Sequence, residues 1–318
     1  MADPVLALGL EAVLGYPAWL HRGIGHPVDW VAAIIASLER RLNRPDIPEG
    51  RRRAGGVLTA AVVAACGAGF GWALQTLAER SGRRGLATAL LATPGLAQRS
   101  LYDHVAAVRG PLARGDLEAA RGAVSRIVGR DVDSLDESGV AAAALESLAE
   151  SFNDGVVAPA FWLAVGGLPG LYAYKAINTA DSLIGHREPR WRAFGWAAAR
   201  ADDLANLIPA RLAGGLIALA GGGGWRTLWR DAPKHASPNA GWPEAAMAGA
   251  LKVKLGGPTR YDGALTERPT FGEGGADPTA DDLSRGLAVF GGACVLLAAG
   301  LAAYGLSRPR RPPKRDPR

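Results

Sequence analysis

Long runs of apolar residues without a single charge dominate the pattern of this chain. Three runs are long enough to cross the roughly 30 Å hydrocarbon core of a bilayer, and they cover residues 54–78, 155–174 and 286–307. Two further runs are marginal: residues 85–98 are short and contain a proline, and residues 204–225 are interrupted by an arginine. Because three such runs are hard to bury in one soluble core, the pattern predicts an all-α, multispanning integral membrane protein.

Polar sequence between the runs predicts two further regions. Residues 99–152 contain GDLEAARGAVSRIVG, with apolar positions at helical spacing, and SLDE at residues 134–137 fits a capping box at the start of another helix. We therefore expect a helical hairpin or a small bundle there. Residues 226–285 are rich in glycine, proline and turn residues. They predict a long ordered loop, and long loops in compact proteins are often functional.

The composition supports a membrane protein and removes some chemistry. Of the 318 residues, 48% are hydrophobic and 21% are charged, and the 43 glycines fall mostly in the apolar stretches, as is common in membrane helices. Cys66 and Cys294 each lie in an apolar run, so we expect no disulfide, zinc site or thioester intermediate. Residues 1–307 are expected to form a single membrane-embedded domain.

The excess positive charge is local. The net charge is +6, and residues 308–318 hold six basic residues and one acidic residue. Rich in proline and basic side chains, this segment predicts a disordered tail that is drawn to anionic lipid at a cytoplasmic face. No aromatic-studded basic fold accompanies it, so nucleic acid is not an expected partner.

Carboxylate and amide side chains gather in three clusters at the edges of the apolar runs. In the first cluster, Glu146, Glu150 and Asp154 are four residues apart, which stacks like charges on one helical face. The second contains Asn178, Asp181, Ser182, His186 and Arg187, and the third contains Arg200, Asp202, Asp203, Asn206 and Arg211. Ionisable groups at membrane depth are costly and usually mark function.

A bound cation would remove the repulsion between these carboxylates. Oxygen ligands without thiols suit Mg²⁺, which one or two carboxylates commonly hold together with substrate phosphate. We therefore predict a phosphate–metal site whose candidate ligands are Glu150, Asp154, Asp181, Asp202 and Asp203. The alternative is a solvated face, in which the first cluster pairs with arginines such as Arg126 and Arg130.

Polar residues of the 226–285 region predict contacts to an anionic substrate. The candidates are His235, Ser237, Asn239, Lys252 and Lys254, which stand among glycines that let backbone N–H groups approach an anion. No G-x-x-x-x-G-K-[ST] motif occurs, which excludes a P-loop. His26 precedes a proline, so it is either a ligand or proton carrier, or a structural residue at a helix start.

Eight motifs follow one another along nearly the whole chain: HPVDW, RSLYDHVAAV, GDLEAARGAVSRIVGRDVDSLD, ESLAESFNDGVVAPAFW, NTADSLIGHR, FGWAAARADDLANLIPARL, DAPKHASPNAGWPEAAMAGAL and LGGPTRYDG. In this order and spacing they resemble the adenosylcobinamide-phosphate synthases, the integral-membrane CobD/CbiB family of cobalamin biosynthesis. Two positions depart from the family pattern. Tyr16 stands where an aspartate is common, and Ser151 stands where an asparagine is common, with Asn153 two residues along to offer an amide.

The resemblance implies a reaction in the cell inner membrane. The protein would join (R)-1-aminopropan-2-ol, or its O-phosphate, to the free propionate of adenosylcobyric acid, with ATP as co-substrate and Mg²⁺ as cofactor. A carboxylate and an amine do not condense in water without activation, so ATP would first convert the propionate to an acyl phosphate. The bilayer is an expected partner, and the other late cobalamin-assembly enzymes are candidates.

For this reaction the candidate residues have distinct expected roles. The catalytic candidates are Glu146, Glu150, Asp181, His186 and Asp203, and the substrate-binding candidates are His26, Asn178, Arg200, Asn206, Arg211, His235, Ser237, Asn239, Lys252 and Lys254.

Two other classes of protein also use carboxylates in membrane helices. A membrane prenyltransferase binds Mg²⁺–pyrophosphate between such helices, but it needs long hydrophobic helices around a lipid-tail cavity, and the polar 99–152 and 226–285 regions argue against that. A transporter uses acidic residues as ion or proton sites, but transporters usually contain inverted repeats, and this chain shows no internal repeat. The topology stays open, because a cytoplasmic basic tail after one crossing at 286–307 would put the 226–285 region outside.

Overall fold

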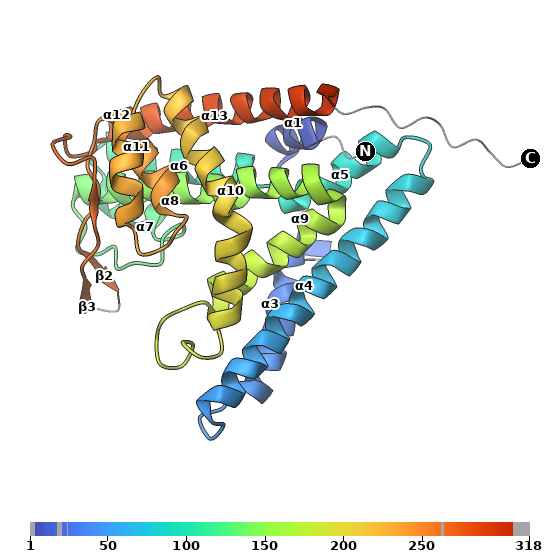
Figure 1. Ribbon diagram of the computed structural model, residues 1–318. Coiled ribbons are helices and arrows are strands. Elements are labelled where there is room, and N and C mark those ends of the chain that lie inside the picture. Colours follow the sequence, from blue (N-terminus) through green and yellow to red (C-terminus); the bar gives the residue numbers. More distant parts are fainter. Residues whose placement is uncertain (1–3, 18–20, 24, 262–263, 308–318) are drawn as a thin grey trace, which may run out of the picture.

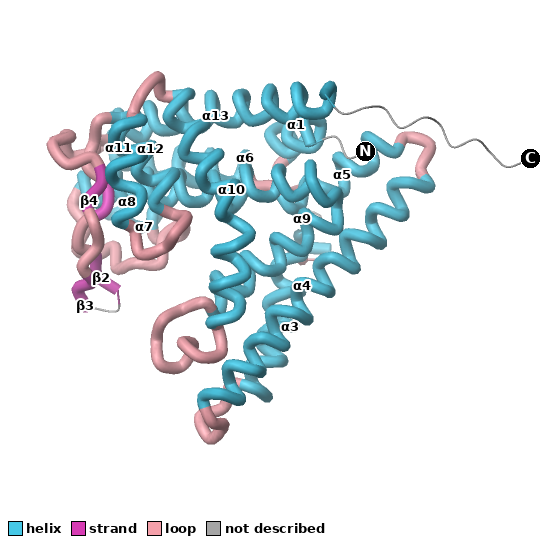
Figure 2. Tube along the Cα trace, viewed as in Figure 1, coloured by secondary structure: helices cyan, strands magenta, loops and turns pink. Residues whose placement is uncertain are grey.

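The computed structural model describes residues 4–17, 21–23, 25–261 and 264–307. The basic tail predicted for residues 308–318 lies outside the described residues. The described chain is almost entirely helical, with a few short strands at one edge (Figures 1 and 2). This confirms the all-α class predicted from the apolar runs.

The helices follow one another in the chain as α1 (Pro4–Leu14), α3 (Pro27–Leu42), α4 (Glu49–Arg80), α5 (Arg84–Ala92), α6 (Gln98–Ala113), α7 (Leu117–Val124), α8 (Glu137–Phe152), α9 (Ala158–Ile184), α10 (Trp196–Ala220), α11 (Trp225–Asp231), α12 (Gly241–Leu251) and α13 (Ala280–Ser307). The 3₁₀ turns η1 (Thr93–Gly95) and η3 (Ala232–Lys234) and the π-helical turn η2 (Asn153–Val157) interrupt this series. The core centres on α8, whose Leu145, Leu148 and Phe152 are fully buried, and α6, α12 and α13 pack around it.

Four helical segments are long and apolar enough to cross a membrane: α4, the continuous run from Glu137 to Ile184, α10 and α13. The predicted runs 54–78 and 286–307 lie inside α4 and α13, and the marginal run 204–225 lies mostly in α10. Many of their apolar side chains are exposed, such as Leu58, Ile208 and Val295. Since none of the described residues covers them, these faces suit contact with lipid.

Two of the predicted runs do not form a straight span. Residues 155–174 contain Gly167, whose φ of 65° and ψ of −157° break α9, and the chain then continues diagonally beside α4 (Figure 1). Only glycine adopts such angles readily, and Pro169 follows it, so the turn is built into the sequence. Residues 85–98 form only the nine-residue α5 and a 3₁₀ turn at Pro94, which is too short to cross a bilayer.

Small residues let α4 lie directly on the backbone of α9. A Cβ atom added to Gly67 would come within 2.4 Å of the Tyr172 carbonyl oxygen, and one added to Gly71 would come within 2.3 Å of the Leu168 carbonyl oxygen. Such a glycine pair four residues apart is a common contact between membrane helices. It fixes the second part of α9, which carries several site residues.

The prediction of a long loop over residues 226–285 was wrong. The segment folds into α11, η3, α12 and two short antiparallel sheets, in which β1 (Leu255–Gly256) pairs with β4 (Thr270–Phe271) and β2 (Thr259–Tyr261) pairs with β3 (Ala264–Thr266). In α12 the run of small apolar residues is almost fully buried. This burial stabilises a helix that glycine and proline content alone disfavours.

The region 99–152 is helical as predicted, but its last helix starts later than the SLDE motif indicates. Asp136, not Ser134, is the N-cap of α8, and its carboxylate accepts a 2.7 Å hydrogen bond from the Gly139 backbone N–H. The helix then runs past Glu146 and Glu150 as expected.

Candidate functional site

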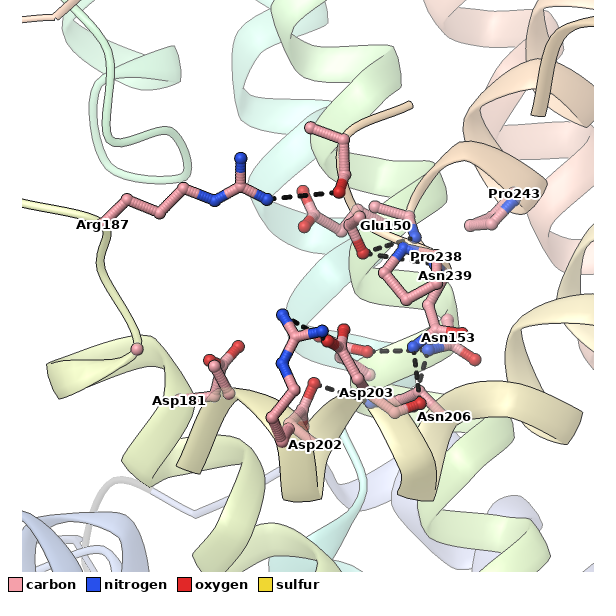
Figure 3. Close-up of a pocket in the computed structure, with 17 residues that line it drawn as sticks. Glu150, Asn153, Asp181, Arg187, Asp202, Asp203, Asn206, Pro238, Asn239 and Pro243 are labelled. Atoms are coloured by element: carbon pink, nitrogen blue, oxygen red, sulfur yellow. Dashed lines mark hydrogen bonds and ion pairs between the residues drawn. The ribbon is translucent and has the colours of Figure 1, made fainter. Parts of the chain in front are cut away.

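Two adjoining pockets contain most of the predicted site residues. The first, of about 200 Å³, is lined by five carboxylates and three asparagines from α8, η2, α9, α10 and the loop before α12; we call it the acid–amide pocket (Figure 3). The second, of about 680 Å³, is lined by three arginines and four glutamates, and we call it the arginine–glutamate pocket. Glu150, Arg187 and Ser237 line both pockets, so the two are continuous.

A π-helical turn sets the geometry of the acid–amide pocket. Glu146 and Glu150 lie on α8 as predicted, but the turn η2 begins at Asn153 and shifts the register before Asp154. The regular spacing predicted for the three carboxylates therefore holds for Glu146 and Glu150 and not for Asp154. π-Helical turns often occur at functional sites, and here the turn lets Asn153 donate hydrogen bonds to Asp154 (2.7 Å) and to the Asn206 carbonyl on α10 (2.8 Å).

Amide groups separate the carboxylates of this pocket. Asn178 Nδ2 bridges Asp154 Oδ2 (3.1 Å) and Asp202 Oδ1 (3.2 Å), and Asn206 Nδ2 donates to Asp202 Oδ2 (3.0 Å). Tyr174 Oη donates to Asn206 Oδ1 at 3.1 Å. Because Asn178 and Asn206 place their amide N–H groups against carboxylate oxygens, these hydrogen bonds offset the repulsion between Asp154 and Asp202.

Lys175 is the half-buried countercharge of this cluster. Its ammonium donates to the Asp154 carbonyl oxygen (3.4 Å) and to Asn178 Oδ1 (3.3 Å). The same side chain lines a third, apolar pocket of about 140 Å³, together with His26. A lysine at this depth lowers the electrostatic cost of the neighbouring carboxylates.

The mouth of the acid–amide pocket is formed by α10 and the loop before α12. Arg200 lies 2.9 Å from Asp203 Oδ2, outside hydrogen-bond geometry, so this buried oxygen has no hydrogen-bond donor among the described residues. Asn239 Nδ2 donates to the Asp203 backbone carbonyl at 2.8 Å and ties the loop to α10. Asn153 Oδ1 is likewise buried without a donor.

The oxygen-rich lining fits partial coordination of a hard cation. All five predicted ligands, Glu150, Asp154, Asp181, Asp202 and Asp203, line this pocket. No three His, Cys, Asp or Glu side chains within the described ranges are positioned to hold one metal ion. The two oxygens without donors, on Asn153 and Asp203, keep lone pairs that a cation or a hydrogen-bond donor can use. The residues therefore fit a Mg²⁺ ion that takes one or two protein ligands and completes its shell with phosphate and water.

Glu146 anchors the arginine–glutamate pocket. Its carboxylate is 2% exposed and accepts hydrogen bonds from Arg130 (2.5 Å), from Arg268 (3.2 Å) and from the Gly256 backbone N–H (2.7 Å). Three separate segments of the chain therefore meet at one side chain. Pairing with Arg130 was the alternative considered for the first carboxylate cluster, and Glu146 does form this ion pair.

Glu244 and His235 face each other across the same pocket, with His235 Nε2 3.8 Å from Glu244 Oε1. Burial, followed by the charges of Glu150 and Glu146, raises the pKa of Glu244 well above its ordinary range. Burial and then the Arg268 charge lower the pKa of His235. Ser237 donates its backbone N–H to His235 Nδ1 at 2.9 Å, so the neutral ring carries its proton on Nε2.

Four predicted substrate-binding residues lie away from both pockets. Lys254 forms a 2.7 Å ion pair with Asp277, and Lys252 ends α12 in the left-handed conformation. Arg211 donates to Asn239 and stacks over the Trp242 ring. His26 accepts the Val28 backbone N–H as the N-cap of α3, which is the structural role considered for it. The other candidates, His186, His235, Ser237, Asn239, Asn178, Arg200 and Asn206, line or border the two pockets.

Several site residues escaped the sequence analysis. Arg187 was named in a cluster without a role, although it lines both pockets and donates to the Ala236 carbonyl (Figure 3). Glu244 is a single carboxylate within an apolar helix, and that was a usable signal. Arg268 lies in an unremarkable turn segment, so only the fold brings it beside Glu146.

Fold and site together define a helical membrane protein whose continuous polar cavity combines buried carboxylates with arginines. A family model described as CobD/Cbib protein matches residues 4–290. The chain therefore belongs to the CobD/CbiB family, as its motifs indicated.

Curated relatives agree over nearly the whole chain. The chain is 52% identical to "Cobalamin biosynthesis protein CobD" of Rhodobacter capsulatus over 290 residues, which is 90% of this chain and 91% of that protein. It is 48% identical to the Sinorhizobium sp. protein of the same name over 312 residues, covering 95% of this chain and 97% of the relative. The Brucella suis protein of that name is 46% identical over 297 residues, with 90% of each chain covered. No solved structure matches this chain.

Proposed function

We propose that this protein is an acid–amine ligase of cobalamin biosynthesis in the cell inner membrane. It joins (R)-1-aminopropan-2-ol, or its O-phosphate, to the free propionate of adenosylcobyric acid, with ATP as co-substrate. Family membership supports the pathway. The observation that carries the reaction class is the continuity of a carboxylate-rich pocket with an arginine-rich one through Glu150 and Arg187.

Amide formation needs an activated acid and a neutral amine. A propionate oxygen attacks the γ-phosphorus of ATP, ADP leaves, and an acyl phosphate forms. The amine nitrogen then attacks the acyl carbon, loses a proton to a base, and expels inorganic phosphate. Arg187 and Arg268 are the cations that suit the tetrahedral oxyanion and the leaving phosphate. Glu150 suits the base, because its exposed carboxylate faces both pockets, and His186 is the alternative.

Mg²⁺ belongs to the acid–amide pocket in this proposal. One or two of the carboxylates of Asp154, Asp181, Asp202 and Asp203 would hold it, together with phosphate oxygens of the nucleotide. Its contribution would be to neutralise phosphate charge while the γ-phosphoryl group is transferred. Arg200, which lies beside Asp203, adds a positive charge at the same mouth.

The test is product formation by purified protein in nanodiscs. Adenosylcobyric acid, the amine or its phosphate, ATP and Mg²⁺ should give the amide product, detected by mass spectrometry, and omission of ATP should abolish it. ¹⁸O placed in the cobyrate carboxylate should appear in inorganic phosphate for an acyl phosphate, or in AMP for an acyl adenylate. Product without label in either species would disprove activation at the acid.

Two variants sharpen the assignment. Glu150→Gln keeps size and polarity but removes the charge, and we expect amide formation to fall at least about a hundredfold, as is typical for loss of a general base. The double variant Cys66→Ala, Cys294→Ala should keep near-normal turnover, because the mechanism forms no thioester. Loss of activity in the folded cysteine-free protein would argue for covalent catalysis instead.

A further inference from the structure

A strongly basic surface lies at one end of α4, away from both pockets. It is formed by the α3–α4 connection, at the lower tip of the molecule in Figure 1, and by residues 188–192 of the neighbouring loop between α9 and α10. We call it the basic tip. Its charged residues are Arg40, Arg41, Arg44, Arg51, Arg52, Arg53, Arg190 and Arg192, against Glu39, Asp46, Glu49 and Glu188, an excess of four positive charges.

A hydrogen bond and an ion pair hold the two parts of the basic tip together. Asn43 donates to the Arg190 backbone carbonyl at 3.2 Å, and Arg190 pairs with Glu39 at 2.8 Å. A Cβ atom on Gly56 would come within 1.7 Å of the Phe194 carbonyl oxygen, so the loop lies directly on α4. The basic tip is therefore one rigid surface and not two independent loops.

Part of its charge has no ion-pair partner among the described residues. Arg40, Arg41 and Arg51 are exposed and form no ion pair within the part of the chain that the structure describes. These three exposed guanidinium groups add positive charge at one end of the molecule. They are therefore available to an anion from outside the protein.

The basic tip borders the lipid-facing surface. About one helical turn after Arg53, the α4 residues Val57 and Leu58 are about half exposed, at 48% and 52%. Trp196, at the start of α10, is 42% exposed, and the Arg53 guanidinium stacks 3.9 Å from its ring centre. A tryptophan between an apolar band and a row of arginines is typical of the membrane–water interface.

We propose that the basic tip binds the headgroups of anionic phospholipids. The order along α4, from arginines through the Trp196 contact to exposed aliphatic residues, matches the order of phosphate, interface and acyl chain in a leaflet. Arginine can donate two parallel N–H hydrogen bonds to one phosphate group, whereas the lysine ammonium acts as a point charge. Basic residues at a helix end mark the cytoplasmic side, so this surface orients the α3–α4 connection toward the cytoplasmic leaflet.

The opposite end of α4 provides a matched control. Arg80 and Arg83 are also exposed arginines at a helix end, but Glu79 lies beside them and pairs with Arg84 at 2.6 Å. That end carries fewer arginines and no stacked tryptophan among the described residues. A general attraction of arginine for lipid would act at both ends, whereas the proposed site acts only at the basic tip.

The test uses the full chain in nanodiscs made from equal parts of phosphatidylcholine and phosphatidylglycerol. After mild extraction, native mass spectrometry reports how many phosphatidylglycerol molecules remain bound. The double variant Arg40→Gln, Arg51→Gln should retain bound lipid about twenty-five-fold more weakly than wild type, because each interfacial arginine contributes about a fivefold factor at low salt. The control Arg80→Gln, Arg83→Gln should match wild type.

Wild-type protein supplies a second measurement that needs no variant. Retained phosphatidylglycerol should fall steeply as salt rises, and phosphatidylcholine should not be retained selectively at any salt. Equal lipid loss in both double variants, or retention that ignores salt, would overturn the proposal. Neither arginine pair lies in the two pockets. A loss of lipid binding in these variants can therefore be distinguished from a loss of amide formation.

Discussion

Replacing Glu146 by glutamine separates an anchoring role from a catalytic one. In the structure its carboxylate joins Arg130, Arg268 and the Gly256 backbone N–H, and all three partners come from different segments. We therefore expect Glu146 to hold two arginines in place for the substrate without reacting itself. The glutamine variant keeps the shape and one acceptor oxygen but loses the charge.

The size of the effect follows from the burial of the partners. The side chains of Arg130 and Arg268 are 11% and 16% exposed, so both guanidinium groups lose a charged partner in a largely dry setting. Removing one member of a buried ion pair costs about 3–5 kcal/mol, and the remaining amide acceptor and partial solvent access reduce this to about 2–3 kcal/mol. For a chain of this size the expected fall in Tm is about 5 °C.

Glu150 is the matched control, because it lies one helical turn further along α8. Its carboxylate is exposed to the pockets, and no hydrogen bond of the described residues involves it. Glu150→Gln should keep a wild-type Tm while losing amide formation. Thermal unfolding in detergent, followed by intrinsic fluorescence, measures both variants. The anchoring role is refuted if Glu146→Gln unfolds at the wild-type temperature, or if Glu150→Gln is destabilised as much.

Three further perturbations test the packing and the electrostatics of the site. Asn178→Asp removes the amide that bridges two carboxylates and adds a third negative charge beside them. Both Tm and turnover should fall by an amount corresponding to about 2 kcal/mol or more. Ser182→Ala, on the same helix, should change neither. Gly71→Val should prevent α4 from packing on α9 and yield aggregated protein in size-exclusion chromatography, whereas Gly69→Val, which has open space around it, should elute normally. Glu244→Gln should stabilise the protein above pH 4.5, the ordinary pKa of the side chain, because the raised folded-state pKa makes ionisation favour the unfolded chain there. The Tm of this variant, measured from about pH 4 to pH 8, should therefore approach that of wild type at the acid end and exceed it at the alkaline end; a constant difference would contradict the titration.

The sequence determined the features that depend on local composition. A long run without charges can form little other than a membrane-crossing helix. The sequence therefore predicted α4 and α13 with their approximate limits. A carboxylate or amide at the edge of such a run is too costly to bury by itself. The residues around Asp154, Asp181 and Asp202 were therefore expected to lie close together, and in the structure these three residues line one pocket.

Tertiary structure alone decided how distant segments meet. The break of α9 at Gly167, the burial of α12 and the short sheets in 226–285 depend on neighbours supplied by other parts of the chain. Contacts with distant segments also decided the positions of two cations. Arg268 contacts Glu146 across 122 residues of sequence, and Lys254 forms an ion pair with Asp277 and lies outside both pockets. Hydropathy and spacing report the environment that a residue needs, but the partner that satisfies a charge is chosen by packing across the whole fold.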